Sequence, residues 1–321
     1  MALARCVYRV HGYSYLSEYI YFPDQIREML DLGRMVSCVA VNPEEEIVGH
    51  GAILPQRPDA KVAEMAQTLV DPRYQGHEVL PKILQELLDQ AKDGGMYGLY
   101  AFAPAWSLSM QETYLDLGGR ETGALLGHGP AEAADAETSG QGRRQTDIIY
   151  YFNLAPGPAR DIYAPPRLEK LIMGILTRCG LNRRIGGKAE RPGEPDEASL
   201  LDTTMHGQWG RASILIKQYG PDVLEQVQAQ LQELRGQGLS CIYLDLPLSD
   251  PATAAQGAAF EDLGFIFGGV LPEMLPGQDV LRLQFLNAPP SDLDAVRTAS
   301  DQGQELFEFV KKGLSTVRTN S

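Results

Sequence analysis

The 321 residues include 42 acidic and 28 basic side chains, which gives a formal net charge of −14. This charge argues against nucleic acids and anionic membranes as partners, because both repel an acidic surface. It is compatible with a cationic substrate such as an amine, although solubility alone would explain it. The length favours two domains, and 44% hydrophobic with 22% charged residues is typical of a soluble globular protein.

The cysteines and the apolar runs exclude several further classes. Cys6, Cys38, Cys179 and Cys241 are scattered and form no C-x-x-C pair, so neither a disulfide framework nor a zinc site is predicted. The opening residues, MALARCVYRVHG, lack the apolar segment of a signal peptide. No apolar run reaches the roughly 18 residues of a transmembrane helix. We therefore expect a cytoplasmic protein that binds no metal.

The first half alternates apolar runs with helical patterns. Residues 5–11 predict a short strand, and the tyrosine-rich segment 12–33 is expected to be helical. The remaining elements follow in order: strands at 35–41, 47–54 and 62–70, a helix over 79–93, a strand at 96–103, a helix at 107–117, and strands at 121–126 and 147–154. The small and polar residues 127–145 predict a long loop between the last two strands.

Residues 62–93 organise this half. The apolar run Val62–Val70 continues through Asp71-Pro72-Arg73-Tyr74-Gln75-Gly76-His77-Glu78 into an amphipathic helix. Its apolar positions keep the i, i+3, i+4 spacing of a helix that buries one face: Leu80, Ile83, Leu84, Leu87, Leu88 and Ala91. A strand that enters a helix through a glycine-containing turn directs unpaired N–H groups and the positive end of the helix dipole at a ligand. The stretch therefore predicts a phosphate site.

The turn matches most of Arg/Gln-x-x-Gly-x-Gly/Ala, the pyrophosphate loop of the GNAT acetyltransferases. Arg73 and Gly76 fit, whereas Glu78 stands where the family has glycine or alanine. The blocks VGHGAIL, AEMAQTLVDPRYQG and YLDLGG, and the order β-α-β-β-β-α-β-α-β-β, also resemble this family over residues 5–155. The resemblance implies an α/β fold of the α+β type, with a mixed, mostly antiparallel sheet flanked by helices.

The second half repeats parts of the first. GMYGLYAFAP from Gly95 corresponds to GLSCIYLDLP from Gly238, and YLDLG from Tyr114 corresponds to FEDLG from Phe260. The turn equivalent to the phosphate loop contains Pro221, which has no N–H to donate. We predict two GNAT-like domains in tandem, the second without a cofactor site. Their bounds are 1–157 and 158–290, with a flexible loop at 186–198 and a helical tail at 291–321.

The resemblance also implies the cofactor site. Acetyl-CoA would be the acetyl donor, with its pyrophosphate on the N–H groups of the turn, charge from Arg73, and strand backbone for the pantetheine arm. The implied residues are Thr68, Leu69, Val70, Arg73, Tyr74, Gln75, Gly76, His77, Glu78 and Val79. A carboxylate beside a diphosphate is unfavourable by roughly 1–4 kcal/mol unless Glu78 points to solvent. The alternative is an ordinary strand–turn–helix connection.

Two catalytic residues and four acceptor residues are implied in the same way. Tyr114 occupies the position of a tyrosine that protonates the coenzyme A thiolate, and Glu64 that of a carboxylate base. The acceptor side would include His11, Tyr13, Tyr15 and His50. Each has a structural alternative: a packed helix tyrosine for Tyr114, a solvated edge for Glu64, a core histidine for His50, and core aromatics for the tyrosines.

These features predict an N-acetyltransferase that moves an acetyl group from acetyl-CoA to an amine by direct attack. The acceptor would be a small molecule or a protein, and a homodimer is left open. The alternative is a non-catalytic acyl-CoA-binding or protein-interaction module, which Glu78 and Gly119 favour. The motifs G-x-S-x-G, H-E-x-x-H and G-x-x-x-x-G-K-[ST] are absent from the sequence, so other chemistries find little support.

Overall fold

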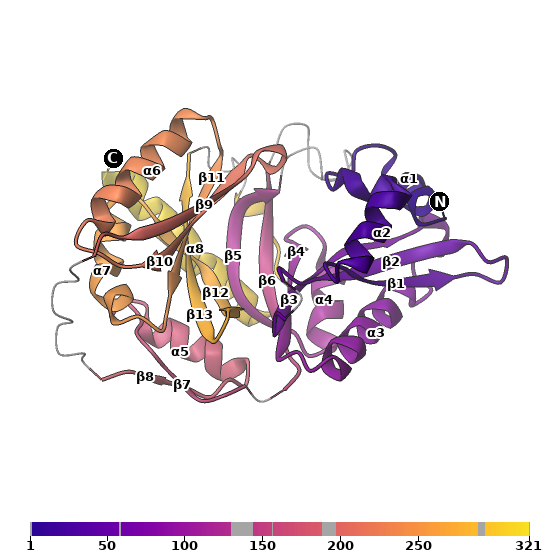
Figure 1. Ribbon diagram of the computed structural model, residues 1–321, viewed down its shortest axis with the longest axis horizontal. Helices are drawn as coiled ribbons and strands as arrows, with labels where there is room; N and C mark the ends of the chain where they lie inside the picture. Colours follow the sequence, from indigo (N-terminus) through magenta and orange to yellow (C-terminus); the bar gives the residue numbers. More distant parts are fainter. Residues whose placement is uncertain are drawn as a thin grey trace.

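The computed structural model describes residues 2–57, 59–129, 144–155, 157–187, 197–287 and 293–320. One sheet of 11 strands runs through the molecule in the order β1-β2-β3-β4-β6-β5-β12-β13-β11-β10-β9. Figure 1 shows β5 and β6 near the middle, with α3 on one side and α6 and α7 on the other. The predicted fold, a mostly antiparallel mixed sheet flanked by helices, is confirmed.

The first half contains α1 (Ala2–His11), η1 (Glu18–Tyr21), α2 (Pro23–Asp31), β1 (Val36–Val41), β2 (Ile47–Leu54), β3 (Val62–Val70), η2 (Pro72–Tyr74), α3 (Val79–Asp93), β4 (Gly98–Pro104), α4 (Leu108–Asp116), β5 (Arg120–Gly129) and β6 (Gln145–Asn153). The predicted strand at 5–11 is wrong, because these residues belong to α1. Leu3, Cys6 and Val7 are the buried residues of this helix, and their i, i+3, i+4 spacing places them on one face.

The second half contains β7 (Arg160–Ile162), α5 (Glu169–Arg178), β8 (Arg183–Ile185), β9 (Leu200–His206), η4 (Gly207–Trp209), β10 (Arg211–Gln218), α6 (Val223–Gly236), β11 (Cys241–Pro247), α7 (Pro251–Asp262), β12 (Ile266–Leu275), β13 (Gln278–Leu286), η5 (Leu293–Ala295) and α8 (Asp301–Asn320). Most of the loops predicted at 127–145 and 186–198 lies outside the described residues. No helix in the described ranges is long and apolar enough to cross a bilayer.

The two halves pair their strands in the same pattern. β3 is parallel to β4 and antiparallel to β2, and β10 is likewise parallel to β11 and antiparallel to β9. β6 lies between β4 and β5 as β13 lies between β11 and β12. The halves meet where Gly123 of β5 pairs with Gly269 of β12. A Cβ on Gly123 would lie 2.2 Å from the Gly268 carbonyl oxygen, so this junction requires glycine.

Helix α8 belongs to the core of both halves. It contacts β5 in the first half and β12 in the second. The side chains of Leu306, Phe307, Val310 and Leu314 are buried on its inner face. Gln111 of α4 accepts a hydrogen bond from the Ala299 N–H just before α8. The segment predicted as a tail therefore ties the two halves together.

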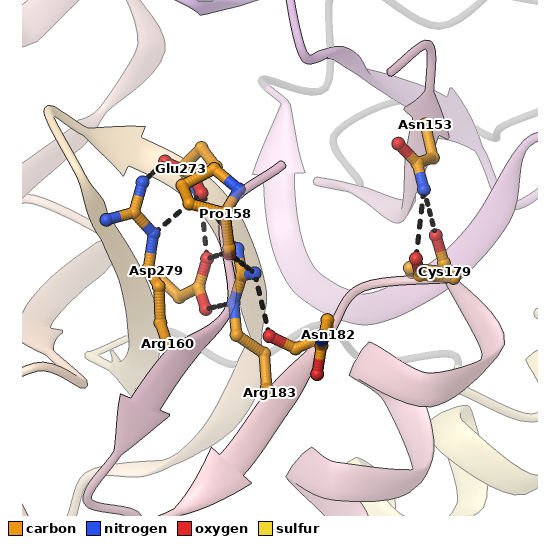
Figure 2. Close-up of polar contacts among 9 residues, drawn as sticks. Asn153, Pro158, Arg160, Cys179, Asn182, Arg183, Glu273 and Asp279 are labelled. Carbon is orange, nitrogen blue, oxygen red and sulfur yellow. Dashed lines mark hydrogen bonds and ion pairs between the residues drawn. The ribbon is translucent and has the colours of Figure 1, made fainter. Parts of the chain in front are cut away.

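A buried network of ion pairs connects the short strands β7 and β8 to the β12–β13 hairpin (Figure 2). Arg183 of β8 donates to both carboxylate oxygens of Asp279, at 2.5 and 3.1 Å, and to Glu273 at 2.8 Å. Arg160 of β7 donates to both oxygens of Glu273 at 2.9 Å. Since the side chains of Arg183, Glu273 and Asp279 are at most 2% exposed, each charge is balanced inside the protein.

Candidate active site

The strands β3 and β4 separate part-way along their length. They pair only from Val62–Gly98 to Glu64–Tyr100, whereas β4 stays paired with β6 as far as Pro104–Asp147. Beyond Glu64, β3 therefore has no pairing partner on its β4 side among the described strands. Thr68, Leu69 and Val70, the residues predicted to bind the pantetheine arm, lie in this part of β3. Their free backbone edge could pair with the amides of an extended ligand.

A β-bulge shapes the same edge. Gln67 has a φ of 55°, and the register between β2 and β3 shifts beside it. The carbonyl oxygen of Gln67 accepts from Nδ1 of His50 at 3.0 Å. The Oε1 atom of Gln67 is buried and has no hydrogen-bond partner among the described residues. An unsatisfied buried acceptor favours a ligand that brings a donor to this position.

His50 supports the bulge from inside the sheet. Its side chain is fully buried, Nδ1–H donates to Gln67, and Nε2 lies 3.0 Å from the Ser37 hydroxyl. Burial lowers the pKa of His50 to about 4. Because both ring nitrogens of His50 make contacts within the sheet, its placement favours a structural role in the core over a role in binding the acceptor.

The low pKa of His50 predicts a loss of stability in mild acid. The folded protein keeps the imidazole neutral, whereas the unfolded chain takes up a proton below its ordinary pKa of 6.5. Stability should therefore fall between pH 6.5 and 4, by about 3 kcal/mol in total. Urea unfolding across this range should show a smaller slope with pH for His50→Gln than for the unchanged protein. The exposed His77→Gln should keep the original slope, and equal slopes in all three would refute the assignment.

The turn after β3 presents four N–H groups without a partner. Tyr74 and Gln75 donate back to Asp71 and Pro72. The N–H groups of Gly76, Glu78, Val79 and Leu80 make no hydrogen bond within the described residues. They precede or begin α3, a helix of 15 residues, so its dipole adds to the attraction for an anion. The predicted phosphate cradle is thus geometrically open.

Glu78 does not occupy this cradle. It is the N-cap of α3 with a φ of 56°, a left-handed conformation that is unfavourable for any residue with a Cβ by about 1–2 kcal/mol. Its side chain is 79% exposed and lies 3.6 Å from Lys82, one helical turn along. The backbone conformation explains why glycine is the better residue here, and the exposure shows that the carboxylate is directed to solvent.

Glycine at position 78 should improve anion binding. Glu78→Gly removes the strain and the nearby negative charge, so we expect acetyl-CoA to bind about 3–10-fold tighter by titration calorimetry. Glu78→Gln removes the charge alone and should give a smaller gain. The greater entropy of the unfolded glycine variant offsets part of the relieved strain, so stability should change by no more than about 1 kcal/mol. Weaker binding by Glu78→Gly would show that the Glu78 side chain contributes to the site.

Arg73 is held by a neighbouring carboxylate. Its Nε and Nη2 donate to the two oxygens of Asp71 at 3.0 and 2.8 Å. Arg9 also donates to Asp71, at 2.7 Å. The hydrogen bonds from Arg73 hold the pKa of Asp71 well below its usual range. Arg73 therefore fixes the start of the turn, and its charge is largely neutralised at the cradle.

Tyr114 lies at the separated edge of β3. It extends from α4, is 1% exposed, and packs edge-on against Tyr150 and Phe152. Burial raises the pKa of Tyr114, while the adjacent Thr68 side chain lowers it. A neutral phenol is thus retained at physiological pH next to a residue of the predicted pantetheine strand. A Cβ on Gly119 would lie 2.7 Å from the Tyr114 carbonyl oxygen, so a larger residue at this position would displace its neighbours.

Glu64 lies in a group of ionisable side chains from both halves. It is half-buried, and this burial raises its pKa, whereas Arg211 and Arg282 lower it. The negative charge of Glu64 in turn raises the pKa of Tyr15, Tyr19, Tyr100 and Tyr114. These shifts place the predicted base within electrostatic range of the predicted acid. A carboxylate with a raised pKa is a better proton acceptor near neutral pH.

The acceptor residues predicted near the N-terminus differ in their placement. Tyr15 and Tyr19 lie within range of Glu64, and the Tyr19 hydroxyl accepts from the Gln67 amide. Tyr13 is 83% exposed and contacts the rings of Tyr8 and Tyr21. The rings of His11 and Tyr15 pack in a tilted arrangement at a centroid distance of 4.8 Å. Tyr15 thus lies within electrostatic range of Glu64, and His11 contacts Tyr15.

Sequence reasoning missed the polar residues that the second half and β6 contribute. Asp147 of β6 is 5% exposed, and burial raises its pKa to about 6. Arg282 of β13 donates to both oxygens of Asp245 of β11 at 2.7 Å. Arg211 opens β10. The signal in the sequence is a charged residue next to apolar strand residues, as in Thr-Asp147-Ile-Ile and Val-Leu-Arg282-Leu.

The equivalent turn in the second half is closed by its own chain. The Gly220 N–H donates to the Ser199 hydroxyl at 2.8 Å, and the Ser199 N–H donates to the Asp222 carboxylate at 2.8 Å. A Cβ on Gly220 would lie 2.4 Å from the Ser199 nitrogen. The hydrogen bond from Ser199 lowers the pKa of Asp222 to about 2, so a carboxylate stands at the N-terminus of α6. The described residues of this turn therefore leave no comparable set of free N–H groups for an anion.

Comparison with known proteins supports the assignment of the first half. Residues 8–118 match the Acetyltransferase (GNAT) family. The match covers about a third of the chain and includes β3, the turn and Tyr114. The resemblance to GNAT enzymes predicted from the sequence is supported over these residues. No curated protein matches the sequence significantly.

Several solved GNAT structures are similar to part of the chain. A ribosomal-protein-alanine N-acetyltransferase from Brucella melitensis shares 19% identity, with 42% of this chain and 78% of that chain covered and a TM-score of 0.35. A putative acetyltransferase from Salmonella typhimurium with its cofactor acetyl-CoA shares 17% identity, with 49% of this chain and 88% of that chain covered and a TM-score of 0.38. A GNAT acetyltransferase from Staphylococcus aureus shares 19% identity, with 47% of this chain and 93% of that chain covered and a TM-score of 0.34. At these scores the likenesses carry no information on the reaction.

Proposed function

We propose that the first half is an N-acetyltransferase domain that uses acetyl-CoA. The observation that carries this proposal is the combination of the free β3 edge with the four unpartnered N–H groups that follow it. One element thus offers backbone for an extended pantetheine arm and a cradle for a diphosphate. The Oε1 atom of Gln67, in the same strand, has no partner among the described residues, and the Tyr114 side chain is adjacent to Thr68 of that strand.

In the proposed reaction the amine attacks the thioester directly, and residues of this chain accept and donate the protons. Bound acetyl-CoA would supply the acetyl group as a thioester. Glu64 takes the proton of the attacking amine, directly or through a water molecule, as the new C–N bond forms. Tyr114 donates its hydroxyl proton to the departing sulfur as the C–S bond breaks. The products are an N-acetyl amide and free coenzyme A, and return of one proton from Glu64 to Tyr114 through solvent restores both residues, so atoms and charge balance.

The second half is proposed to be a related domain without a cofactor site of its own. Its strand pairing follows that of the first half, but Phe260 replaces Tyr114 and the turn at Gly220 is filled by Ser199. Such a domain would form one side of the acceptor site of the first domain. Release of coenzyme A thiol, followed with a thiol reagent over a panel of amines, tests the activity. Binding of acetyl-CoA without any transfer would instead favour a non-catalytic acyl-CoA-binding module.

Removal of the Tyr114 hydroxyl should slow turnover without weakening cofactor binding. Tyr114→Phe keeps the ring contacts with Tyr150 and Phe152, so we expect kcat to fall by roughly 100-fold with the KM for acetyl-CoA within a factor of about two. Tyr150→Phe is the matched control, since it removes a neighbouring hydroxyl that contacts Gln111, and its kcat should stay near the original. Equal rates in Tyr114→Phe and the unchanged enzyme would remove Tyr114 from the mechanism.

A further inference from the structure

Arg211 is a half-buried guanidinium that has no carboxylate partner among the described residues. Its Nη1 lies 2.5 Å from His128 Nε2 and donates to the His128 carbonyl oxygen at 3.2 Å. The guanidinium also stacks over Trp209 at 4.6 Å. Within the described ranges no ion pair reaches Arg211, and its Nε and Nη2 make no hydrogen bond. Burial lowers the pKa of Arg211, because the positive charge loses solvation that its neighbours do not fully replace.

The other buried arginine of this region is already neutralised. Arg282 binds Asp245 through two hydrogen bonds of 2.7 Å, and its guanidinium lies 4.9 Å from the ring of Tyr243. A fork–fork pair of this kind uses both carboxylate oxygens. Arg211 is therefore a cation of this group that has no carboxylate partner among the described residues.

Two acidic residues of the first half lie within electrostatic range of Arg211. Glu64 and Asp147 raise its pKa by their charge, and it lowers theirs, but neither comes within ion-pair distance. The strand pairing explains the division of charge. Glu64 pairs with Tyr100 as Ser213 pairs with Tyr243, so the second half has a neutral residue where the first has its acid. The first half thus contributes two carboxylates to this group, and Arg211 contributes a cation from the second half.

The orientation of Arg211 is fixed by neighbours from both halves. His128 of β5 accepts from Arg211 at Nε2, so its proton is on Nδ1, which lies 2.7 Å from the Tyr243 hydroxyl. The His128 ring stacks on Phe102 at 4.9 Å. With Nη1 engaged and the face covered by Trp209, the Nε–Nη2 edge of Arg211 remains, and its spacing matches the two oxygens of a carboxylate.

We propose that the acetyl acceptor is an amine that carries a carboxylate, as amino acids and peptides do, and that Arg211 of the second half binds this carboxylate. The inference rests on the proposed acetyltransferase function and assigns its substrate class. The acceptor's amine lies toward Glu64 and Asp147, and its carboxylate toward Arg211. A phosphate dianion fits less well, because one guanidinium faces it and two carboxylates lie nearby. Arg211 is a positioning and specificity residue.

The test compares matched acceptors that differ only in the anion. A panel of free amino acids and short peptides is assayed beside the corresponding C-terminal carboxamides, with acetyl-CoA binding measured separately by calorimetry. We expect kcat/KM to be at least about tenfold higher for acids than for carboxamides. Arg211→Gln should abolish this preference and leave the acetyl-CoA dissociation constant unchanged. Arg34→Gln, an exposed arginine at the far end of the first half, should keep it.

The outcomes separate this inference from the function on which it rests. Failure to bind acetyl-CoA overturns both. Binding of acetyl-CoA with equal transfer to acids and carboxamides, or with transfer to no member of the panel, overturns the acceptor assignment alone. A preference for acids that persists in a folded Arg211→Gln overturns the role of Arg211. Should Arg211→Gln fail to fold, Arg211→Lys and the acid–carboxamide comparison on the unchanged protein decide the matter.

Discussion

Replacement of Glu64 by glutamine is expected to lower kcat by roughly 100-fold or more at neutral pH. Glutamine keeps the shape of the side chain but cannot accept the amine proton. Burial raises the pKa of Glu64, and Arg211 and Arg282 lower it; the net shift is upward, so the carboxylate is more basic than an exposed one. The rate of the unchanged enzyme should rise with pH as this carboxyl loses its proton. That rise should be absent in the variant.

The controls for this experiment separate chemistry from structure. The dissociation constant for acetyl-CoA should be the same in Glu64→Gln as in the unchanged protein, because the cradle is formed by the turn after β3. Glu112→Gln, an exposed glutamate on α4, should leave kcat unchanged. If Glu64→Gln retains full activity, Asp147 becomes the candidate base, since its pKa of about 6 also suits the role.

Replacement of Arg183 by methionine is expected to destabilise the fold by roughly 3–5 kcal/mol. The change removes the ion pair between Arg183 and Asp279 (Figure 2). It also removes the ion pair between Arg183 and Glu273, which keeps its ion pair with Arg160. A buried carboxylate without a cation is far less stable than the same group in water. Urea unfolding at neutral pH measures the loss directly.

The neighbouring residue provides the matched control. Arg184 is 70% exposed and pairs at 3.0 Å with Asp161, which is 50% exposed, so Arg184→Met should change stability by less than about 1 kcal/mol. Adding Asp279→Asn to Arg183→Met should recover part of the loss, because it removes the unpaired charge. Similar stabilities for the two arginine variants would mean that the network contributes little to the fold.

Local patterns predicted the centre of the first half well. The strand at 62–70 and the helix at 79–93 were expected at the positions where the structure has β3 and α3. Here apolar periodicity, the glycine turn and burial all favour the same elements. The N-terminal helix was mistaken for a strand because its alternating apolar residues fit either period. The strands β7 and β8 were not predicted, since three residues each give no periodic signal.

The polar group around Glu64 could not be assembled from the sequence. The family resemblance implies Glu64 and Tyr114, but Arg211 and Arg282 come within electrostatic range of Glu64 because β5 pairs with β12 across the two halves. This contact depends on glycines whose role appears only in three dimensions. Likewise, whether Glu78 blocks the turn depended on a backbone angle and on the direction of one side chain.

Titration calorimetry of the full chain with acetyl-CoA tests the central claim most directly. The open cradle after β3 and the closed turn at Gly220 predict one binding site per chain, with a dissociation constant in the range of about 1 μM to 1 mM that is typical of enzyme substrates. Two sites per chain would contradict the account of the second half. No heat of binding at millimolar acetyl-CoA would contradict the proposed function itself.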